Sequence, residues 1–171
     1  MDKLPDVHDP AFRRARGLPD EAIRTKPISI SDPAWANRLK AFWWYRENIK
    51  SAEPEIIALH ELLLSIGGEE TCLAKQDPDT EKLLARGRYH SGEARLRKLE
   101  PGQCHQNACD LYRPGRNEIA TGYALSDDGL WRQHSWIVTG ESITETTERR
   151  LAYFGYVLTE QEAAQFLLDN M

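Results

Sequence analysis

Three residues in the second half of the chain, Cys104, His134 and Glu145, have the types and the order of a thiol nucleophile, its base and the carboxylate that orients the base. A cysteine at neutral pH is mostly thiol, so a catalytic cysteine needs a nearby base and a stabilising dipole. Three such groups serve cysteine hydrolases and acyl transferases, and they need no cofactor. We therefore treat the three residues as a candidate catalytic triad.

The position of Cys104 suits a nucleophile. Pro101 and Gly102 predict a turn, and residues 104–112 predict a short helix, so Cys104 falls in the first helical turn. Unpaired N–H groups at a helix start carry partial positive charge, which favours thiolate and can hold a developing oxyanion. The alternative is that Cys104 is a small buried apolar residue, as free cysteines usually are.

A predicted hairpin carries the other two groups. Residues 130–139 and 142–146 read as strands that run back on each other. For a tight turn centred on Thr139–Gly140, His134 and Glu145 lie directly opposite each other. Opposed residues on one sheet face have Cβ atoms about 5 Å apart. This is close enough for a hydrogen bond between imidazole and carboxylate.

The hairpin leaves two interpretations open. In the first, Glu145 accepts from one nitrogen of His134 and leaves the other facing Cys104. In the second, His134 and Glu145 are a cross-strand surface pair that only stabilises the hairpin. A one-residue change of register would instead place Thr144 or Thr146 opposite His134.

Three neighbours are candidates for supporting roles. Gln103 precedes Cys104 and could lend its side-chain amide to an oxyanion hole. Asn107 shares a helix face with Cys104, where it could orient a loop, bond to a substrate or satisfy buried backbone groups. Trp136 alternates with His134, so it should share the same sheet face and shield the imidazole from water.

A metal site is the competing interpretation of this region. Cys104, His105, Cys109 and His134 are all possible ligands. Structural zinc sites use closely spaced pairs on turns. Five positions on a helix instead separate Cys104 from Cys109 by about 140°. We therefore expect no metal.

Four short segments resemble a group of uncharacterised bacterial and phage proteins, which are similar to the transglutaminase-like branch of the papain-like cysteine protease superfamily. The segments are Cys104–Ala108, Gly122–Leu125, His134–Trp136 and Tyr153–Gly155. That branch has Cys at a helix start, His-Ala-Trp on a strand and Asp-Pro-Thr on the next strand. The resemblance covers roughly residues 100–168, and it implies a papain-like fold and thiol-dependent acyl chemistry.

The chain departs from that branch at two places. His134-Ser-Trp136 and Glu145-Thr-Thr147 stand where the branch has His-Ala-Trp and Asp-Pro-Thr. His105 and Gln106 follow the cysteine where the branch has a nearby Trp. The superfamily also contains members that kept the fold and lost the chemistry, and a shared fold does not fix function.

The whole chain of 171 residues fits one domain. Residues 1–30 contain four prolines and little apolar periodicity, which predicts an extended or partly ordered arm. Residues 31–171 are expected to form a single α+β domain. Helices fill residues 31–100, and a helix plus a small, mostly antiparallel sheet fills residues 101–171, with the nucleophile at a helix N-terminus.

One predicted helix contains adjacent tryptophans, Trp43 and Trp44. Both cannot face the core from one helix, so the pattern predicts that one lines a groove or a partner surface.

Composition restricts the partners. The formal net charge of −5 argues against a nucleic-acid backbone as the main partner. No apolar run is long enough to span a bilayer, and residues 1–10 lack the apolar core of a signal peptide. The three cysteines are too few for a disulfide scaffold, which favours a reducing cytoplasm.

The sequence therefore predicts a cysteine-dependent hydrolase or acyl transferase that acts on an acyl-bearing small molecule, a peptide or a protein. The alternative is a catalytically silent papain-like fold that serves as a binding or regulatory module.

Overall fold

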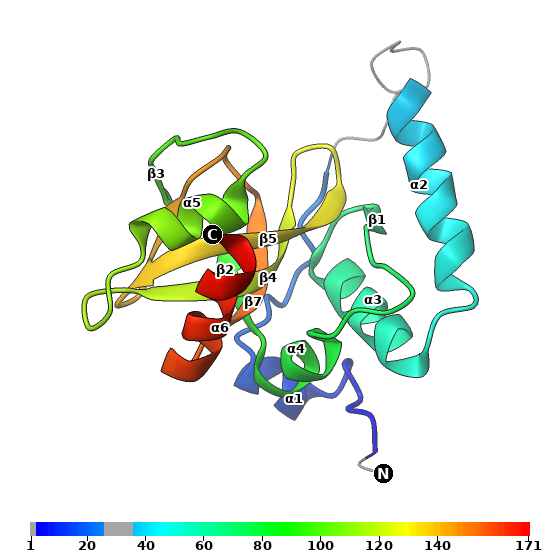
Figure 1. The fold of residues 1–171 in the computed structure, drawn as a ribbon. Helices are drawn as coiled ribbons and strands as arrows, with labels where there is room; N and C mark the ends of the chain where they lie inside the picture. The colour runs from blue at the N-terminus through cyan, green and yellow to red at the C-terminus, as the bar shows by residue number, and fades with distance from the viewer. Residues whose placement is uncertain (1–2, 26–35) are drawn as a thin grey trace.

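The computed structural model describes residues 3–25 and 36–171, and these residues form six helices and a seven-stranded sheet (Figure 1). The helices are α1 (Pro10–Ala15), α2 (Ala36–Ile49), α3 (Pro54–Ile66), α4 (Thr80–Arg86), α5 (Cys104–Leu111) and α6 (Glu160–Asn170). The predicted α+β class is confirmed.

The sheet is mixed and curled, with most of its pairs antiparallel. Its strands are β1 (Glu70–Thr71), β2 (Arg88–Ser91), β3 (Arg95–Leu96), β4 (Glu118–Leu125), β5 (Leu130–Thr139), β6 (Ser142–Glu145) and β7 (Ala152–Val157). Their order is β2-β7-β4-β5-β6-β3, and β1 adds to β5 in parallel. The long strands β4 and β5 form the centre, with β7 on the other side of β4.

Alternate residues of the central strands point to two separate clusters. On one side, the strands pack against apolar residues of α3, α4 and α5, together with Phe166 of α6. On the other side lies a smaller cluster that contains Ala120, Ala124, Trp136, Val138, Ile143 and Tyr153. His134 belongs to this second face, since it alternates with Trp136 along β5.

Local sequence explains the helices that frame the sheet. α3 begins with a proline in its first turn and buries a continuous apolar stripe, Ile56, Leu59, Leu62, Leu63 and Ile66. α6 begins with a capping box, in which Thr159 and Glu162 each accept from the other's backbone N–H. In Figure 1, α5 and α6 lie together over the sheet, while α3 and α4 lie side by side at its other end.

The N-terminal segment differs from the predicted arm. Within residues 3–25 the chain forms α1, which Asp9 caps through the N–H of Phe12. Val7 and Leu18 are buried in the main core. A few apolar residues therefore suffice to fix this proline-rich segment on the domain. Residues 26–30, and the expected start of the next helix at 31–35, lie outside the described residues.

The expectation that residues 31–100 are helical is incomplete. This part also contributes β1, β2 and β3. These strands are only two to four residues long and carry several charged residues, so they show no apolar alternation in the sequence. They form because the ends and edges of longer strands offer them partners.

Among the residues described in Figure 1, no helix is long and apolar enough to cross a membrane.

Candidate active site

α5 begins at Cys104, as the sequence predicts, and a tight turn precedes it. Gly102 has a φ of 73°, a conformation that favours glycine. The buried side chain of Asn107 donates through Nδ2 to the carbonyl oxygen of Glu100 at 2.8 Å. Asn107 thus ties the helix to the turn that presents Cys104, which is one of the roles expected of it.

Cys104 lies at an interruption in the edge of β5. β1 pairs with β5 at Leu130 and Trp131, and β6 pairs with it at residues 137–139. Between these two pairings, none of the described strands covers this edge. The N–H of Ser135 instead donates to the sulfur of Cys104. The helix start therefore occupies a place that a strand would otherwise fill.

The pKa of Cys104 lies below its usual value. Burial alone would raise this pKa, because a charged thiolate loses solvation. A hydrogen bond and charge interaction with His134 oppose that effect, together with the N–H groups of Ser135 and His105. These contacts outweigh burial, so they favour the thiolate form.

His134 and Glu145 are in direct contact, although the predicted register is wrong. Ile137 pairs with Thr144, and Thr139 pairs with Ser142, so the turn is centred on Gly140–Glu141. Continued in this register, the residue opposite Glu145 is Trp136. The pairing differs by two positions from the predicted one, and an even difference keeps both side chains on the same face.

The contact between His134 and Glu145 is buried. Nε2 of His134 lies 2.8 Å from Oε2 of Glu145 and 3.0 Å from Oε1. His134 is 2% exposed and Glu145 is 1% exposed. An ionised carboxylate only accepts hydrogen bonds, so Nε2 carries a proton and donates it. Nδ1 of His134 is then the nitrogen left for Cys104. These geometries exclude a surface pair that only stabilises the hairpin.

Burial by itself would lower the pKa of His134, but this pKa is raised. Hydrogen bonds and charge interactions with Cys104 and Glu145 favour the imidazolium. The lowered pKa at Cys104 and the raised pKa at His134 have one common cause, the interaction between the two groups, which shifts the balance toward a thiolate beside an imidazolium.

His134 is not the sole donor to Glu145, because Thr147 and Tyr153 also donate hydrogen bonds to this carboxylate. Thr147 donates to Oε1 through its backbone N–H at 2.9 Å and its hydroxyl at 3.0 Å. The hydroxyl of Tyr153 donates to Oε2 at 2.8 Å. Burial would raise the pKa of Glu145, but the bond and charge of His134, with these other donors, lower it to about 2. Glu145 is therefore a carboxylate at neutral pH.

Trp136 is fully buried beside the imidazole, as predicted. Its ring centroid lies 6.2 Å from that of His134 and 4.9 Å from that of Tyr153. The ring fits because residue 155 is a glycine and has no side chain. A Cβ on Gly155 would lie 2.5 Å from Cη2 of Trp136. The aromatic rings exclude water from one side of His134.

A second polar chain runs beside the candidate triad. Nδ1 of His105 donates to Oγ of Ser135 at 2.7 Å, and Oγ of Ser135 donates to Oγ1 of Thr121 at 3.0 Å. Thr121 in turn donates to the carbonyl oxygen of His134 at 3.5 Å. Burial, then the charge of His134, lower the pKa of His105. His105 is therefore neutral at pH 7 and holds α5 against β5.

The site also contains three residues that were not predicted from the sequence, Tyr153, Thr147 and Ser135. Thr147 could have been found, because a threonine two residues after a buried carboxylate often bonds to it. Tyr153 required the strand order, which places β7 beside β4. Ser135 contacts Cys104 through its backbone N–H, and no pattern of residue types in the sequence indicates such a backbone contact.

The role expected of Gln103 is not supported by a contact in the structure. Gln103 is exposed, and its side chain makes no hydrogen bond to a described residue, so its role toward an oxyanion stays a prediction. Within residues 3–25 and 36–171, no group of three or more His, Cys, Asp or Glu side chains is placed to hold a metal ion.

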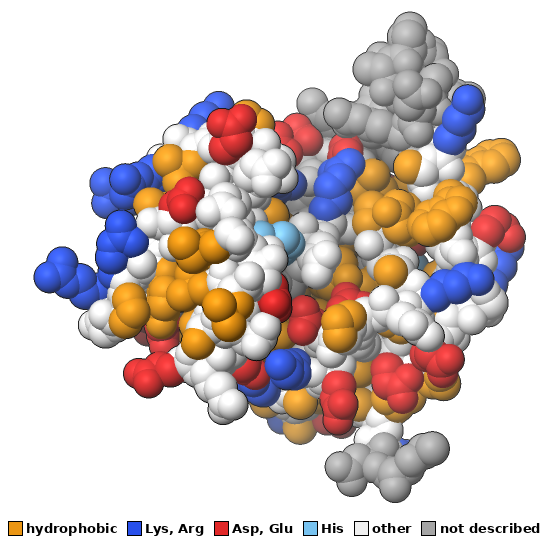
Figure 2. All heavy atoms as spheres, viewed as in Figure 1, with side chains coloured by type: hydrophobic (Ala, Val, Ile, Leu, Met, Phe, Trp, Pro, Cys, Tyr) orange, Lys and Arg blue, Asp and Glu red, His pale blue; other side chains and the backbone are white. Residues whose placement is uncertain are grey.

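The face shown in Figure 2 is hollowed between the part that carries α5 and α6 and the part that carries α2 and α3. A histidine side chain is visible in the hollow. Two cavities of about 330 and 500 Å³ share the exposed residue Gln133, which precedes His134 in β5. His105, the residue after Cys104, lines the smaller one. Both cavities thus adjoin the chain neighbours of the candidate catalytic residues.

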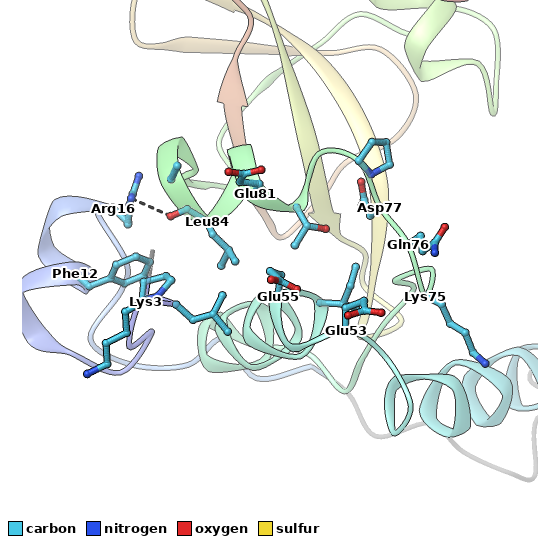
Figure 3. Close-up of a pocket in the computed structure, with 16 residues that line it drawn as sticks. Lys3, Phe12, Arg16, Glu53, Glu55, Lys75, Gln76, Asp77, Glu81 and Leu84 are labelled. Carbon is cyan, nitrogen blue, oxygen red and sulfur yellow. Dashed lines mark hydrogen bonds between the residues drawn. The ribbon is translucent and has the colours of Figure 1, made fainter. Parts of the chain in front are cut away.

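A larger cavity, about 880 Å³, lies between the N-terminal segment, α3 and the segment that leads into α4 (Figure 3). Phe12 and Leu84 line it together with the carboxylates of Glu53, Glu55 and Glu81. None of the three candidate catalytic residues reaches it. The candidate active site is therefore located by its hydrogen-bonded groups and not by cavity size.

No match to this chain is found among protein-family models, curated proteins or solved structures.

Proposed function

We propose that the protein is a cysteine-dependent hydrolase or acyl transferase of papain-like, transglutaminase-like type, with Cys104 as nucleophile, His134 as base and Glu145 as orienting carboxylate. The observation that carries the proposal is the continuous hydrogen-bonded chain from Cys104 through His134 to Glu145, in which the pKa of the thiol is lowered and that of the imidazole is raised. This combination favours a reactive thiolate at neutral pH.

The chemistry follows from these charges. The thiolate of Cys104 attacks a carbonyl carbon, a C–S bond forms, and the carbonyl oxygen becomes an oxyanion. N–H groups of the first turn of α5 stabilise that oxyanion, with Gln103 as a further donor. His134 gives its proton to the leaving group, the bond to the leaving group breaks, and an acyl-thioester remains on Cys104.

Release of the acyl group returns the site to its starting state. Neutral His134 removes a proton from an attacking water or amine, which adds to the thioester carbonyl. Collapse of this adduct breaks the C–S bond and leaves the Cys104 thiolate beside protonated His134. Water gives hydrolysis and an amine gives acyl transfer. Glu145 keeps Nε2 protonated throughout, so that Nδ1 exchanges the proton.

The three cysteines are free, and the chemistry requires Cys104 to be reduced. We therefore assign the activity to a reducing compartment, with the cytoplasm as the expected one, and to acyl-bearing small molecules, peptides or proteins rather than nucleic acids or membranes.

The test is acylation of Cys104 by acetyl and phenylacetyl thioesters at pH 7, followed by intact-mass and peptide mass spectrometry. The proposal predicts one acyl group on Cys104, its loss in Cys104→Ser, and a rate at least about 100-fold lower in His134→Ala, the usual size of a general-base effect. Added methylamine then separates the two reaction classes, because a transferase converts it to the amide. Acylation no faster than in the urea-unfolded chain would contradict the proposal.

A binding module without turnover is the second candidate. The observation in its favour is the depth of the site, because His134 and Glu145 are almost completely buried. A module would form the acyl-thioester slowly or not at all, and any adduct would persist. Release of the acyl group within minutes in the native chain, but not in His134→Ala, would exclude this alternative.

A further inference from the structure

A nearly buried arginine lies beside the candidate orienting carboxylate. The side chain of Arg150 is 9% exposed, and Nε of Arg150 lies 4.0 Å from Oε2 of Glu145. That oxygen already accepts hydrogen bonds from His134 and Tyr153, each at 2.8 Å. Nε of Arg150 is buried and makes no hydrogen bond within the described part of the chain. Arg150 therefore acts on Glu145 through its charge and not as a direct donor.

Hydrogen bonds fix the position of this charge. Nη1 of Arg150 donates to Oγ of Ser126, in the loop between β4 and β5, at 2.7 Å. Nη2 donates to Oγ1 of Thr147, in the loop between β6 and β7, at 3.1 Å. The hydroxyl of Thr147 donates in turn to Oε1 of Glu145 at 3.0 Å. Both loops thus hold Arg150 next to the carboxylate.

The other charged or titratable groups around Arg150 influence the site less than Glu145 does. Nη1 of Arg150 also lies 3.4 Å from Oε1 of Glu148, but the side chain of Glu148 is 69% exposed, so water and salt screen this pair. Arg149 is exposed as well. Burial, then Glu145, raise the pKa of Tyr153, so this hydroxyl is neutral at pH 7. The charge of Arg150 opposes that rise, so its influence extends into the buried site.

Arg150 and His134 are two cationic groups that share one carboxylate. A carboxylate raises the pKa of a neighbouring histidine, and a nearby like charge lowers it. Glu145 is among the causes of the raised pKa of His134. Arg150 offsets part of this rise, because its positive charge opposes a second one at the same carboxylate. Its effect on Cys104 is weaker, since the thiol contacts the opposite side of the imidazole ring from Glu145.

The basicity of His134 matters most when the acyl group is released. Cys104 is then a neutral thioester, and only neutral His134 can remove a proton from the attacking water or amine. A general base works best when its pKa lies near the operating pH. A carboxylate without a second cation would hold the imidazole protonated to higher pH and slow this step.

We propose that Arg150 is a positioning residue that shares Glu145 with His134 and lowers the basicity of the imidazole, so that His134 is neutral when it must act as the base. The proposal rests on the function proposed above and adds the residue that tunes its second half. The chain offers a matched control, because Arg149 is the adjacent arginine and is exposed.

The first measurement does not require activity. In Cys104→Ser, position 104 carries no charge, as in the acyl-enzyme, and an NMR titration of the isotope-labelled imidazole gives the pKa of His134. Arg150→Gln should raise this pKa by about one unit, the lower end of the effect expected of a charge at this range. Arg150→Met, a second uncharged replacement that keeps an apolar stem, should give the same rise. Arg150→Lys should restore most of the native value, and Arg149→Gln should keep it.

The second measurement is the release of an acetyl group from Cys104 as a function of pH, followed by intact-mass spectrometry. The rate should rise with pH and reach a plateau above the pKa of His134. Arg150→Gln should move this rise upward by about one pH unit, so that release below its midpoint slows about tenfold and the plateau does not fall. The pH dependence of Cys104 alkylation by iodoacetamide should stay close to native, because the thiol is on the far side of the imidazole.

The contrary results are distinguishable. An unchanged or lowered pKa of His134 in both Arg150→Gln and Arg150→Met would overturn the proposal, and so would release that slows equally at every pH. The proposed function would stand in either case. An equal rise in Arg149→Gln would show a general effect of surface charge and overturn the proposal too. If the native chain forms no acyl-enzyme on Cys104, the proposed function fails, and the role of Arg150 in release fails with it.

Discussion

His134 reaches Glu145 diagonally across the hairpin of β5 and β6, with 2.8 Å between Nε2 and Oε2. Direct cross-strand neighbours are not required for this contact, because both side chains lie on the same face and diagonal neighbours are within reach of long side chains. A glutamate has one more methylene than an aspartate, and this added length suits the diagonal. The carboxylate therefore fits its place in this hairpin.

Glu145→Gln should raise the apparent pKa of Cys104. A neutral amide stabilises imidazolium less than a carboxylate does, so the pKa of His134 falls and the thiolate loses its charged partner. We expect a rise of about one unit or more at Cys104, equivalent to roughly 1.4 kcal/mol. The pH dependence of iodoacetamide alkylation measures it, and an unchanged profile would show that Glu145 does not act through His134.

Tyr153→Phe should have a smaller effect of the same sign. It removes one hydrogen bond to Oε2 of Glu145 and keeps the buried ring beside Trp136. One hydrogen bond to a charged group contributes about 1.5–3 kcal/mol, of which only part reaches Cys104 through two intervening groups. Tyr153 is thus a positioning residue. If Tyr153→Phe lowers stability but leaves the pH profile of Cys104 alkylation unchanged, Tyr153 has only a structural role.

Protonation of Glu145 should destabilise the fold in acid. Its pKa is about 2 in the folded chain, below the ordinary value of 4.5. A lowered pKa contributes stability that is complete above pH 4.5 and is lost as the pH falls toward 2. The loss is on the order of 3 kcal/mol. Urea unfolding at several pH values should therefore show a shallower fall for Glu145→Gln than for the native chain.

Glu162→Gln is the control for this acid effect. The hydrogen bond from Arg86, at 2.7 Å, is the main reason that the pKa of Glu162 is also about 2. Its protonation acts in the same pH range, and its side-chain partners are Arg86 and Lys82 rather than a candidate catalytic residue. Both variants should reduce the acid dependence of stability, but only Glu145→Gln should change the alkylation of Cys104. Equal effects on Cys104 would argue against a specific role for Glu145.

Asn107→Ala should disturb the turn before Cys104. It leaves the carbonyl of Glu100 without its donor and removes a buried amide, at a cost of about 1–3 kcal/mol. Among the residues that the structure describes, the side chain of the neighbouring Gln106 bonds only to Asp110, on the surface of the helix. Gln106→Ala should therefore cost less than about 0.5 kcal/mol. Thermal unfolding and Cys104 alkylation compare the two amides, and equal losses would contradict the assigned role of Asn107.

Several features of the site could be predicted from the sequence because they are local. The turn at Gly102 and the helix that follows it place Cys104 at a helix start. The alternation of His134 with Trp136 places both on one face, and the hairpin brings Glu145 to that face. The register could not be fixed, because Gly140 is compatible with turns centred on either side of it.

The remaining features depend on which strands are neighbours. Tyr153 reaches Glu145 only because β7 lies beside β4 and the sheet curls. The contact of Ser135 with Cys104 needs the interruption between β1 and β6, and β1 has only two residues. Such contacts arise from tertiary packing, so neither periodicity nor residue type indicates them.

Gly155→Ala should damage the site through packing alone. A Cβ at this position would lie 2.5 Å from Cη2 of Trp136 and 2.5 Å from the carbonyl oxygen of Thr121. The second contact is with backbone and cannot relax by a side-chain rotation. We expect a loss of about 1–3 kcal/mol in the free energy of unfolding, measured in urea. Native stability in this variant would contradict the close approach of β4 and β7 at Gly155.

The central claim is that Cys104 and His134 form a thiolate–imidazolium pair. Its most direct test is the pH dependence of iodoacetamide alkylation at Cys104, in a Cys72→Ser, Cys109→Ser background with and without His134→Ala. The account predicts an apparent pKa well below the ordinary value of about 8.5, and a rise above that value in His134→Ala, where burial of the thiol is no longer opposed by the imidazole. An apparent pKa at or above the ordinary value that does not respond to His134→Ala would contradict it.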